Sequence, residues 1–218
     1  YATFPENIFK RLYVKHPYNW TPIGSIEHLN SATLGAFKAF YNKFYLPNNA
    51  TLSIAGDLDI AKTKELIKAY FGDIPKGDAV MQPEIQEPPL GGEKTATVFD
   101  DVQLSALMMG YRMPPQKSDD AYALEMAGTV LSGGASSRMY KRLVDEDQTA
   151  AFVQVFPFSL EQGGAFIMLA FANADKKIED MKPAIEQEIE QLQNELISER
   201  EFQKIQNQME SAFIQSNS

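Results

Sequence analysis

The amino-acid sequence predicts an α+β fold in which helices cover a largely antiparallel sheet. Two apolar stretches, Ala151 to Phe158 and Ala165 to Ala172, flank Glu161-Gln162-Gly163-Gly164, a connection typical of a β-hairpin. After this hairpin, apolar residues from Ile178 to Leu196 recur at intervals of three and four, which indicates an amphipathic helix. Strands followed by pairs of helices favour an antiparallel sheet over a doubly wound parallel one.

The first third of the chain is predicted to be mainly helical. A helix begins at Pro5 and carries an apolar stripe as far as Tyr13. Residues His16 to Asn30 contain prolines and a glycine and show no sustained period, so we expect a structured loop. The elements expected next are a helix capped by Ser31 or Thr33 and ended by Pro47, a strand around Leu52 and Ile54, and a helix capped by Asp59 that carries Leu66 and Phe71.

A connector rich in proline and glycine, Pro75 to Gly92, leads into the second half of the chain. Pro157 cannot donate a backbone hydrogen bond, so we expect it at a strand end or in an edge strand. Pro183 is expected in the first turn of its helix or at a kink. The elements expected besides the hairpin are strands at Lys94–Phe99 and Leu104–Tyr111, helices at Asp119–Leu131, Met139–Val144 and Ile178–Leu196, and a last helix that begins at the capping box Ser198–Glu201.

Composition and charge exclude several classes of function. The formal net charge of -9 and the pI near 4.8 have the wrong sign for a nucleic-acid-binding protein. No apolar run approaches the roughly 18 to 20 residues of a membrane-spanning helix. The chain has no cysteine, which excludes disulfides and thiolate sites and is compatible with the bacterial cytoplasm or periplasm. The first residue, Tyr1, and the helical period near Ser218 lead us to expect that both ends are truncated.

The two histidines form a poor metal site. A catalytic zinc ion normally has three protein ligands, and without cysteine these would be histidines and carboxylates. His16 and His28 lie on either side of a loop, without the spacing that directs two imidazoles from one helix toward one ion. Glu27-His28 matches the end of a His-x-x-Glu-His motif, but Gly24 stands where the first histidine would be. A solvated loop pair is the simpler interpretation.

Other catalytic motifs are also missing. No Gly-x-Ser-x-Gly or Ser-x-x-Lys motif is present, and Ser136 and Ser137 are better interpreted as caps of the next helix. Gly72 and Gly77 have phosphate-loop spacing, but Asp78 stands where lysine is required. The acidic run Asp145-Glu146-Asp147 is typical of an exposed helix face. We therefore predict no catalytic, cofactor-binding or metal-binding residue in this chain.

Five ordered blocks, spread over nearly the whole chain, resemble the pitrilysin/insulinase family of zinc metallopeptidases. The first three lie downstream of the place where the family has its metal site, and the last contains a Gly-Ser-Ser-Arg-type turn. The blocks are His16-Pro17-Tyr18 with Pro22-Ile23-Gly24 and Glu27, Phe40-Tyr41 with Phe44 to Ala50, Ile54-Ala55-Gly56-Asp57, Tyr70-Phe71-Gly72-Asp73-Ile74-Pro75, and Leu131 to Tyr140.

The resemblance implies the second, inactive domain of one peptidase half, with the α+β fold of mitochondrial-processing-peptidase-like domains. The family's His-x-x-Glu-His motif, which binds zinc and activates water, would lie before Tyr1. Residues 1–218 would then be one domain, in which residues 1–30 are the remnant of the preceding zinc domain and the lead-in from it. Zinc is expected in the parent protein and not in this chain, and the expected partners are the zinc domain, the other peptidase half and peptide substrates.

The resemblance also indicates which half of the peptidase this is. In the family's non-metal half, a substrate-holding arginine and tyrosine follow the Ser-Ser-Arg turn. The matching positions here are Val144 and Ala151, so neither role is present. This departure favours the second domain of the zinc-bearing half.

Three hypotheses about function follow. The first is a structural, chamber-forming domain of a zinc peptidase, without hydrolytic activity of its own. The second is an assembly or interaction module of a family member that has lost its metal site. The third is an independent enzyme that uses His16, Glu27 and His28.

Overall fold

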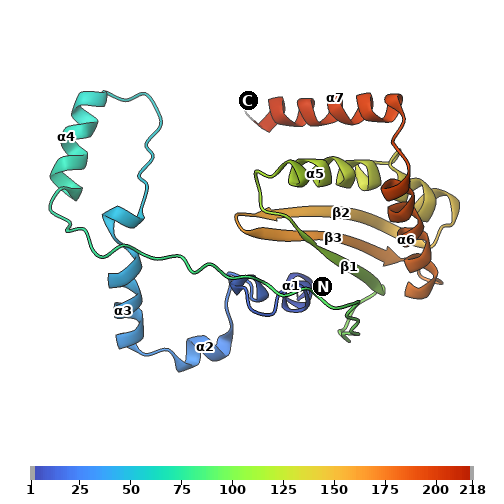
Figure 1. Ribbon diagram of the computed structural model, residues 1–218, viewed down its shortest axis with the longest axis horizontal. Helices are drawn as coiled ribbons and strands as arrows, with labels where there is room; N and C mark the ends of the chain where they lie inside the picture. The colour runs from blue at the N-terminus through green and yellow to red at the C-terminus, as the bar shows by residue number, and fades with distance from the viewer. Residues whose placement is uncertain (1–2, 217–218) are drawn as a thin grey trace. The chain divides into compact units, whose positions relative to one another are not determined.

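The computed structural model describes residues 3–216, and the chain divides into two compact units. Unit 1 comprises residues 1–21 and 87–218, and unit 2 comprises residues 22–86. Unit 1 contains the sheet, and both units contribute helices (Figure 1). No helix in the described range is both long and apolar enough to cross a membrane.

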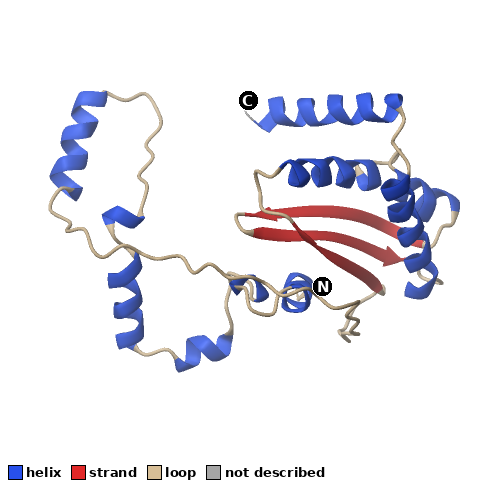
Figure 2. Ribbon diagram, in the orientation of Figure 1, coloured by secondary structure: helices blue, strands red, loops and turns tan. Residues whose placement is uncertain are grey.

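Unit 1 is built on an antiparallel sheet of three strands among the described residues (Figure 2). The strands β1 (Ala106–Met113), β2 (Ala150–Leu160) and β3 (Gly163–Ala172) lie in the order β1-β3-β2. The predicted hairpin is therefore confirmed, and the strand expected at residues 104–111 begins two residues later. The strand expected at Lys94–Phe99 is wrong, because these residues pair with no other strand and their side chains are exposed. The α+β fold class with an antiparallel sheet is confirmed.

Helices cover one face of the sheet. The helices α5 (Asp119–Ser132) and α6 (Ile178–Asn194) and the π-helical segment η3 (Tyr140–Glu146) enclose the larger hydrophobic core with the side chains that this face presents. The helix α7 (Glu199–Ser216) packs on α5 (Figure 1). The largest fully buried side chains of this core are Leu131, Met139, Leu143, Met168, Met181 and Ile185.

A single helix, α1 (Phe4–Leu12), packs against part of the opposite face, where it forms a smaller core. Its apolar stripe places Phe9 and Leu12 against Ala165 and Ile167 of β3. Gly110 allows this approach, because a Cβ atom there would lie 3.0 Å from Ile8. The sheet is therefore an inner layer with α1 on one side and α5, α6 and η3 on the other.

Local signals in the sequence predicted the helix starts well. The Thr33 hydroxyl and the Asp59 carboxylate, both expected as caps, each accept a hydrogen bond from a backbone N–H of the first helical turn. The Ser118 hydroxyl, which was not expected as a cap, does the same at the start of α5. Pro157 lies in β2, which is an edge strand as expected. Pro183 lies inside α6 beyond its first turn, so the first-turn alternative is wrong.

Unit 2 consists of helices and loops, and none of its residues, 22–86, is buried. The region predicted as loop contains a short helix, because the Ser25 hydroxyl caps the His28 N–H. The strand expected at Leu52 and Ile54 is absent: residues 50–55 have no strand partner. The helical elements are α2 (Ile26–Ser31), α3 (Leu34–Phe44), η2 (Pro47–Asn49) and α4 (Ile60–Phe71).

The close approach of α5 to β2 gives a first prediction. A Cβ atom at Gly128 would lie 2.6 Å from Pro157 Cγ, which is shorter than any normal contact. Glycine-to-alanine substitution inside a helix usually stabilises by roughly 0.5–1 kcal/mol. At Gly128 we expect the opposite, a loss of about 1–3 kcal/mol through overpacking. Thermal and urea unfolding of Gly128→Ala measure this, and stability equal to wild type would contradict the close contact.

Gly35→Ala is the matched control. Gly35 also lies inside a helix, α3, but a Cβ atom there meets only Thr33 Oγ1 at 3.7 Å, an ordinary contact distance. This substitution should leave the unfolding of unit 1 unchanged and should not destabilise α3.

Candidate functional site

The structure places the two histidines in different units and different surroundings. His16 is buried in unit 1. Its Nδ1 accepts from the Tyr18 N–H at 3.2 Å, and its Nε2 lies 3.0 Å from Gln162 Oε1, which is an acceptor, so Nε2 carries the proton. His28 and Glu27 are exposed on α2 of unit 2. Both ring nitrogens of His16 are therefore used in hydrogen bonds, and neither is open to a metal ion.

The other residues considered from the sequence have structural environments. The caps expected at Ser136 and Ser137 are wrong: the Ser136 hydroxyl accepts from Lys204, and the buried Ser137 hydroxyl has no hydrogen-bond partner among the described residues. Gly72 ends α4, which is unlike the start of a helix that a phosphate loop requires. Asp147 accepts from Arg142 Nε at 2.7 Å. Among residues 3–216, no three metal-ligating side chains lie close enough together to hold an ion.

Glu87 and Arg112 form a polar cluster in unit 1, which we call the Glu87–Arg112 clamp. The Glu87 carboxylate accepts hydrogen bonds from three consecutive backbone N–H groups, those of Val14, Lys15 and His16, at 2.6, 2.9 and 2.7 Å. Arg112 Nη2 lies 3.3 Å from the same carboxylate. The clamp joins the last part of the N-terminal segment of unit 1 to the first residue after unit 2.

Arg112 extends the clamp to the sheet and to α1. Its Nε donates to the Leu12 carbonyl and its Nη1 to the Pro88 carbonyl, each at 2.6 Å. The guanidinium lies 5.5 Å from the centre of the Tyr13 ring, a cation–π distance. The Tyr13 hydroxyl donates to the Gly164 carbonyl and accepts from the Gly164 N–H, at 2.7 and 2.8 Å. One arginine thus connects β1 with the end of α1 and with the connector.

The clamp holds Glu87 in its charged form. Burial raises the pKa of this carboxyl group, but the hydrogen bonds from His16, Val14 and Lys15 and the charge of Arg112 together outweigh burial and lower it. Burial raises the pKa of Tyr13, so this hydroxyl group stays protonated and can donate to Gly164. The clamp is a structural cluster. Hydrogen-bond donors occupy both oxygens of the Glu87 carboxylate, which leaves no free position for a substrate.

A second ion pair ties α7 to the turn after α5. Arg138 Nε and Nη2 donate to the two oxygens of Glu201 at 3.0 and 2.8 Å, a bidentate geometry. The hydrogen bond from Arg138 lowers the pKa of Glu201. Ser198 caps the Glu201 N–H, as the capping-box prediction required, but the Glu201 carboxylate binds Arg138. Arg138, the arginine of the Ser-Ser-Arg turn, therefore has a structural role: it holds α7 against this turn.

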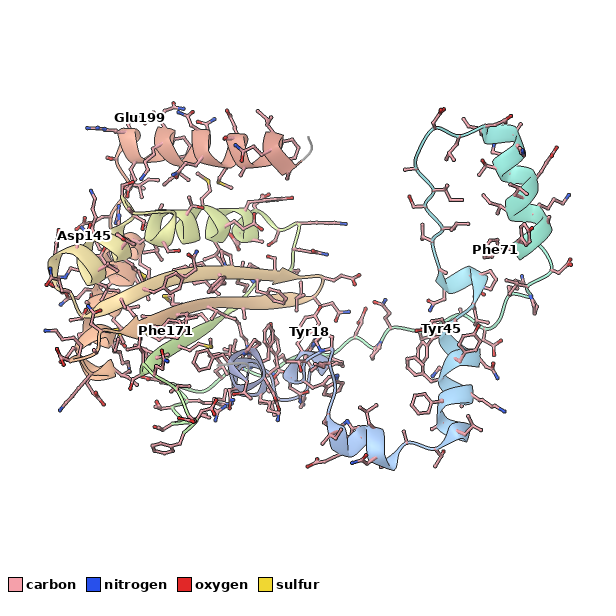
Figure 3. The ribbon with its side chains drawn as sticks, turned by 180° about the vertical axis from the view of Figure 1, so that it is seen from behind. Tyr18, Tyr45, Phe71, Asp145, Phe171 and Glu199 are labelled. Atoms are coloured by element: carbon pink, nitrogen blue, oxygen red, sulfur yellow. The ribbon has the colours of Figure 1, made fainter. Side chains whose placement is uncertain are left out.

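Large exposed apolar side chains are concentrated on unit 2. On α3, Phe37 and Tyr41 lie one helical turn apart and are 57% and 60% exposed. Figure 3 shows the side chains of Tyr45, at the end of α3, and Phe71, at the end of α4. An isolated soluble protein rarely exposes so many large apolar side chains. The full exposed set in unit 2 is Ile23, Ile26, Leu29, Leu34, Phe37, Phe40, Tyr41, Tyr45, Leu52, Ile54, Leu58, Ile60, Leu66, Tyr70, Phe71, Ile74 and Met81.

Comparison with known proteins identifies the family. Residues 31–209 match the family model described as the Peptidase M16 inactive domain. The chain belongs to the M16 peptidase family. This confirms the resemblance to pitrilysin/insulinase-type peptidases, and in particular to their inactive domain.

Relatives of the M16 domain are named zinc proteases. The zinc protease PqqE of Helicobacter pylori is 32% identical over 209 residues, which are 94% of this chain and 47% of the relative. A crystal structure of a protease from Helicobacter pylori has a TM-score of 0.88 at 31% identity and covers 98% of this chain and 52% of that one. The peptidase M16 inactive domain from Pseudomonas fluorescens has a TM-score of 0.76 at 22% identity, with 93% and 49% covered. The chain thus spans about half the length of these relatives.

The Glu87–Arg112 clamp gives a prediction with a pH dependence. Glu87→Gln removes the charge that four donors share, so we expect a loss of about 1.5–3 kcal/mol in the free energy of unfolding at pH 7. Because the folded-state pKa is lowered, the contribution of Glu87 is fully present above the ordinary glutamate value near pH 4.3 and is lost as the pH falls through the folded-state value. Urea unfolding of both proteins between pH 3 and 7 measures the difference.

Glu161→Gln is the charge-matched control, since Glu161 is exposed in the turn between β2 and β3. It should unfold like wild type at every pH. If the difference in unfolding free energy between wild type and Glu87→Gln does not shrink as the pH falls, the clamp does not depend on the charge of this carboxylate.

The surroundings of His16 and His28 predict that the purified chain binds no stoichiometric zinc. Elemental analysis after dialysis against zinc measures the metal content, and His28→Ala should leave it unchanged. One zinc ion per chain, lost in this variant, would restore the hypothesis of an independent enzyme.

Proposed function

We propose that this chain is the non-catalytic domain of a zinc peptidase, that it supports the zinc-binding domain of the same peptidase half, and that it lines the chamber in which peptides are held. Zinc and the water-activating base belong, in this proposal, to the supported domain. The residues described here do not fit a zinc site, so the part of this chain is to bind and orient.

The observation that carries the proposal is that unit 2 lacks a core. Its 65 residues, 22–86, include apolar helix faces but no buried residue. The conformational entropy that a segment of this size loses on folding costs far more free energy than its sparse burial of apolar surface contributes. Unit 2 therefore needs a partner that covers its apolar faces.

The proposed partner is the zinc-binding domain of the parent protein. About half the length of each relative lies outside the region that matches this chain, and these relatives are named proteases. The alternating residues around Leu52 and Ile54 lack a strand partner within the described chain, and a sheet edge on the incoming domain would supply one. The covering domain would then contribute both apolar contacts and backbone hydrogen bonds.

The experiment is assembly from two polypeptides. We expect the gene to encode a His-x-x-Glu-His motif upstream of the Tyr1 codon. When that upstream polypeptide is co-expressed with this chain, the two should co-purify, contain zinc and hydrolyse an unfolded peptide. The double variant Phe37→Asp/Tyr41→Asp places two charges on the exposed face of α3 and should abolish co-purification, because charged carboxylates are costly to bury unpaired.

Tyr122→Asp is the matched control for this variant. Tyr122 is 56% exposed on α5 in unit 1, so its substitution should leave assembly unchanged. Co-purification that survives the α3 variant would contradict the proposed contact. An upstream sequence without the zinc motif, together with intact assembly, would favour the interaction module over the peptidase domain.

A further inference from the structure

Side-chain hydrogen bonds fasten the chain segment that precedes unit 2 to the turn between β2 and β3. The hydroxyl of Tyr18, which is labelled in Figure 3, accepts from the Gln162 N–H at 3.2 Å. The Tyr13 hydroxyl bonds to both backbone groups of Gly164. His16 Nε2 lies 3.0 Å from Gln162 Oε1. The His16 ring also packs on both tyrosines, with ring centres 5.8 Å from Tyr13 and 4.1 Å from Tyr18. His16 is therefore at the centre of this fastening.

The His16 side chain also holds the 3₁₀ turn that follows it. This turn, η1 (Pro17–Asn19), begins at His16, whose Nδ1 accepts from the Tyr18 N–H at 3.2 Å. A backbone N–H can only donate, so Nδ1 must present a lone pair to it. The hydrogen bond therefore exists only with a neutral imidazole. The turn lies just before Thr21, the last residue of the N-terminal segment of unit 1.

Protonation of His16 would place two donors against each other. An imidazolium carries an N–H at both nitrogens, so Nδ1–H would face the Tyr18 N–H and the hydrogen bond would be lost. The contact with Gln162 would remain, because Nε2 donates in both forms of the ring. Protonation would therefore remove the cap of η1 selectively.

The charged groups on the elements around His16 are few. Glu87 of the connector accepts from the His16 backbone N–H, and Arg112 of β1 is paired with the same carboxylate. Lys15, the preceding residue, and Glu161, in the hairpin turn, are exposed, so water and salt screen their charges. The two tyrosine rings in contact with the imidazole are uncharged phenols near neutral pH. The hydrogen bond at Nδ1 is thus the feature that protonation changes.

We propose that His16 is a pH-sensitive latch, in which the neutral ring holds η1 and protonation of the ring releases the segment through which the chain leaves unit 1. The latch goes beyond the supporting function above, because it makes the attachment of the partner-facing unit depend on acidity. Release concerns residues 17–21. The Glu87–Arg112 clamp and Tyr13 make their hydrogen bonds without the imidazole, so they keep α1 in place.

The test follows the ring and the backbone in the same samples by NMR. The sequence has two histidines, and His28 is exposed, so His28→Ala leaves His16 as the single imidazole signal. Samples between pH 8 and 5 give the protonation state of Nδ1 and the hydrogen-exchange protection factor of the Tyr18 amide. This range lies above the ordinary glutamate value near pH 4.3, and the pKa of Glu87 is lowered, so Glu87 stays charged. As Nδ1 gains its proton, the protection factor should fall at least about tenfold, through loss of one backbone hydrogen bond.

His16→Asn is the matched control. The asparagine Oδ1 can accept the same N–H, since asparagine is a preferred N-cap, and it does not titrate. The protection factor of Tyr18 in this variant should change by less than about twofold over the same range. The amide of Met168, a fully buried residue of β3, reports on global unfolding and should keep its protection in both proteins.

An Nδ1 that stays unprotonated down to pH 5 would overturn the proposal. So would a Tyr18 amide that keeps its protection after the ring is protonated, or a fall in protection that His16→Asn shares. A simultaneous loss of protection at Met168 would also overturn it, because the chain would then unfold as a whole instead of releasing η1. The assembly experiment depends on the apolar faces of unit 2, so its outcome is independent of these measurements.

Discussion

The structure depends on one carboxylate that holds two distant parts of the chain together. Residues 14–16 and residue 87 are separated by all of unit 2, yet the Glu87–Arg112 clamp joins them with three backbone hydrogen bonds and an ion pair. The Glu87 side chain is only 11% exposed, so water competes weakly for these bonds. Through Arg112, the clamp also fixes the end of α1 to β1, and α1 covers part of the second face of the sheet.

This arrangement divides the work between the two units. Unit 1 has two hydrophobic cores and satisfied polar clusters, so it supplies the rigid scaffold. Unit 2 has exposed aromatic faces and no core, so it is suited to being covered by a partner. In the proposed function this division has a meaning, because the domain would contribute shape and contacts while the chemistry would belong to another domain.

The sequence predicted the elements whose signals are local. Thr33, Asp59 and Ser198 cap the helices expected of them, and the hairpin of β2 and β3 follows from its turn residues. Leu52–Ile54 and Lys94–Phe99 have strand-like patterns but form no strand, since a strand exists only with a hydrogen-bonding neighbour. Pattern alone could not reveal whether that neighbour is in the chain.

The clamp and the exposed phenylalanines of β2 lay beyond sequence reasoning for different reasons. Glu87 looked like one more acid in a proline-rich connector, and its partners lie more than 70 residues earlier in the chain. The phenylalanines of β2 did carry a signal: β2 is apolar on both faces, with Val153 and Val155 facing one side and phenylalanines the other. A strand that is apolar on both faces indicates that both are covered.

Because the clamp joins residues 14–16 to Glu87, the chain between them forms one long loop that is closed by contacts within unit 1. Loop-closure entropy changes only slowly with length, so a longer, shorter or wholly different segment between Thr21 and Glu87 would cost the scaffold little. Related proteins could therefore exchange the partner-facing part while they keep the sheet, and a single cut in unit 2 would leave the scaffold joined through its own contacts.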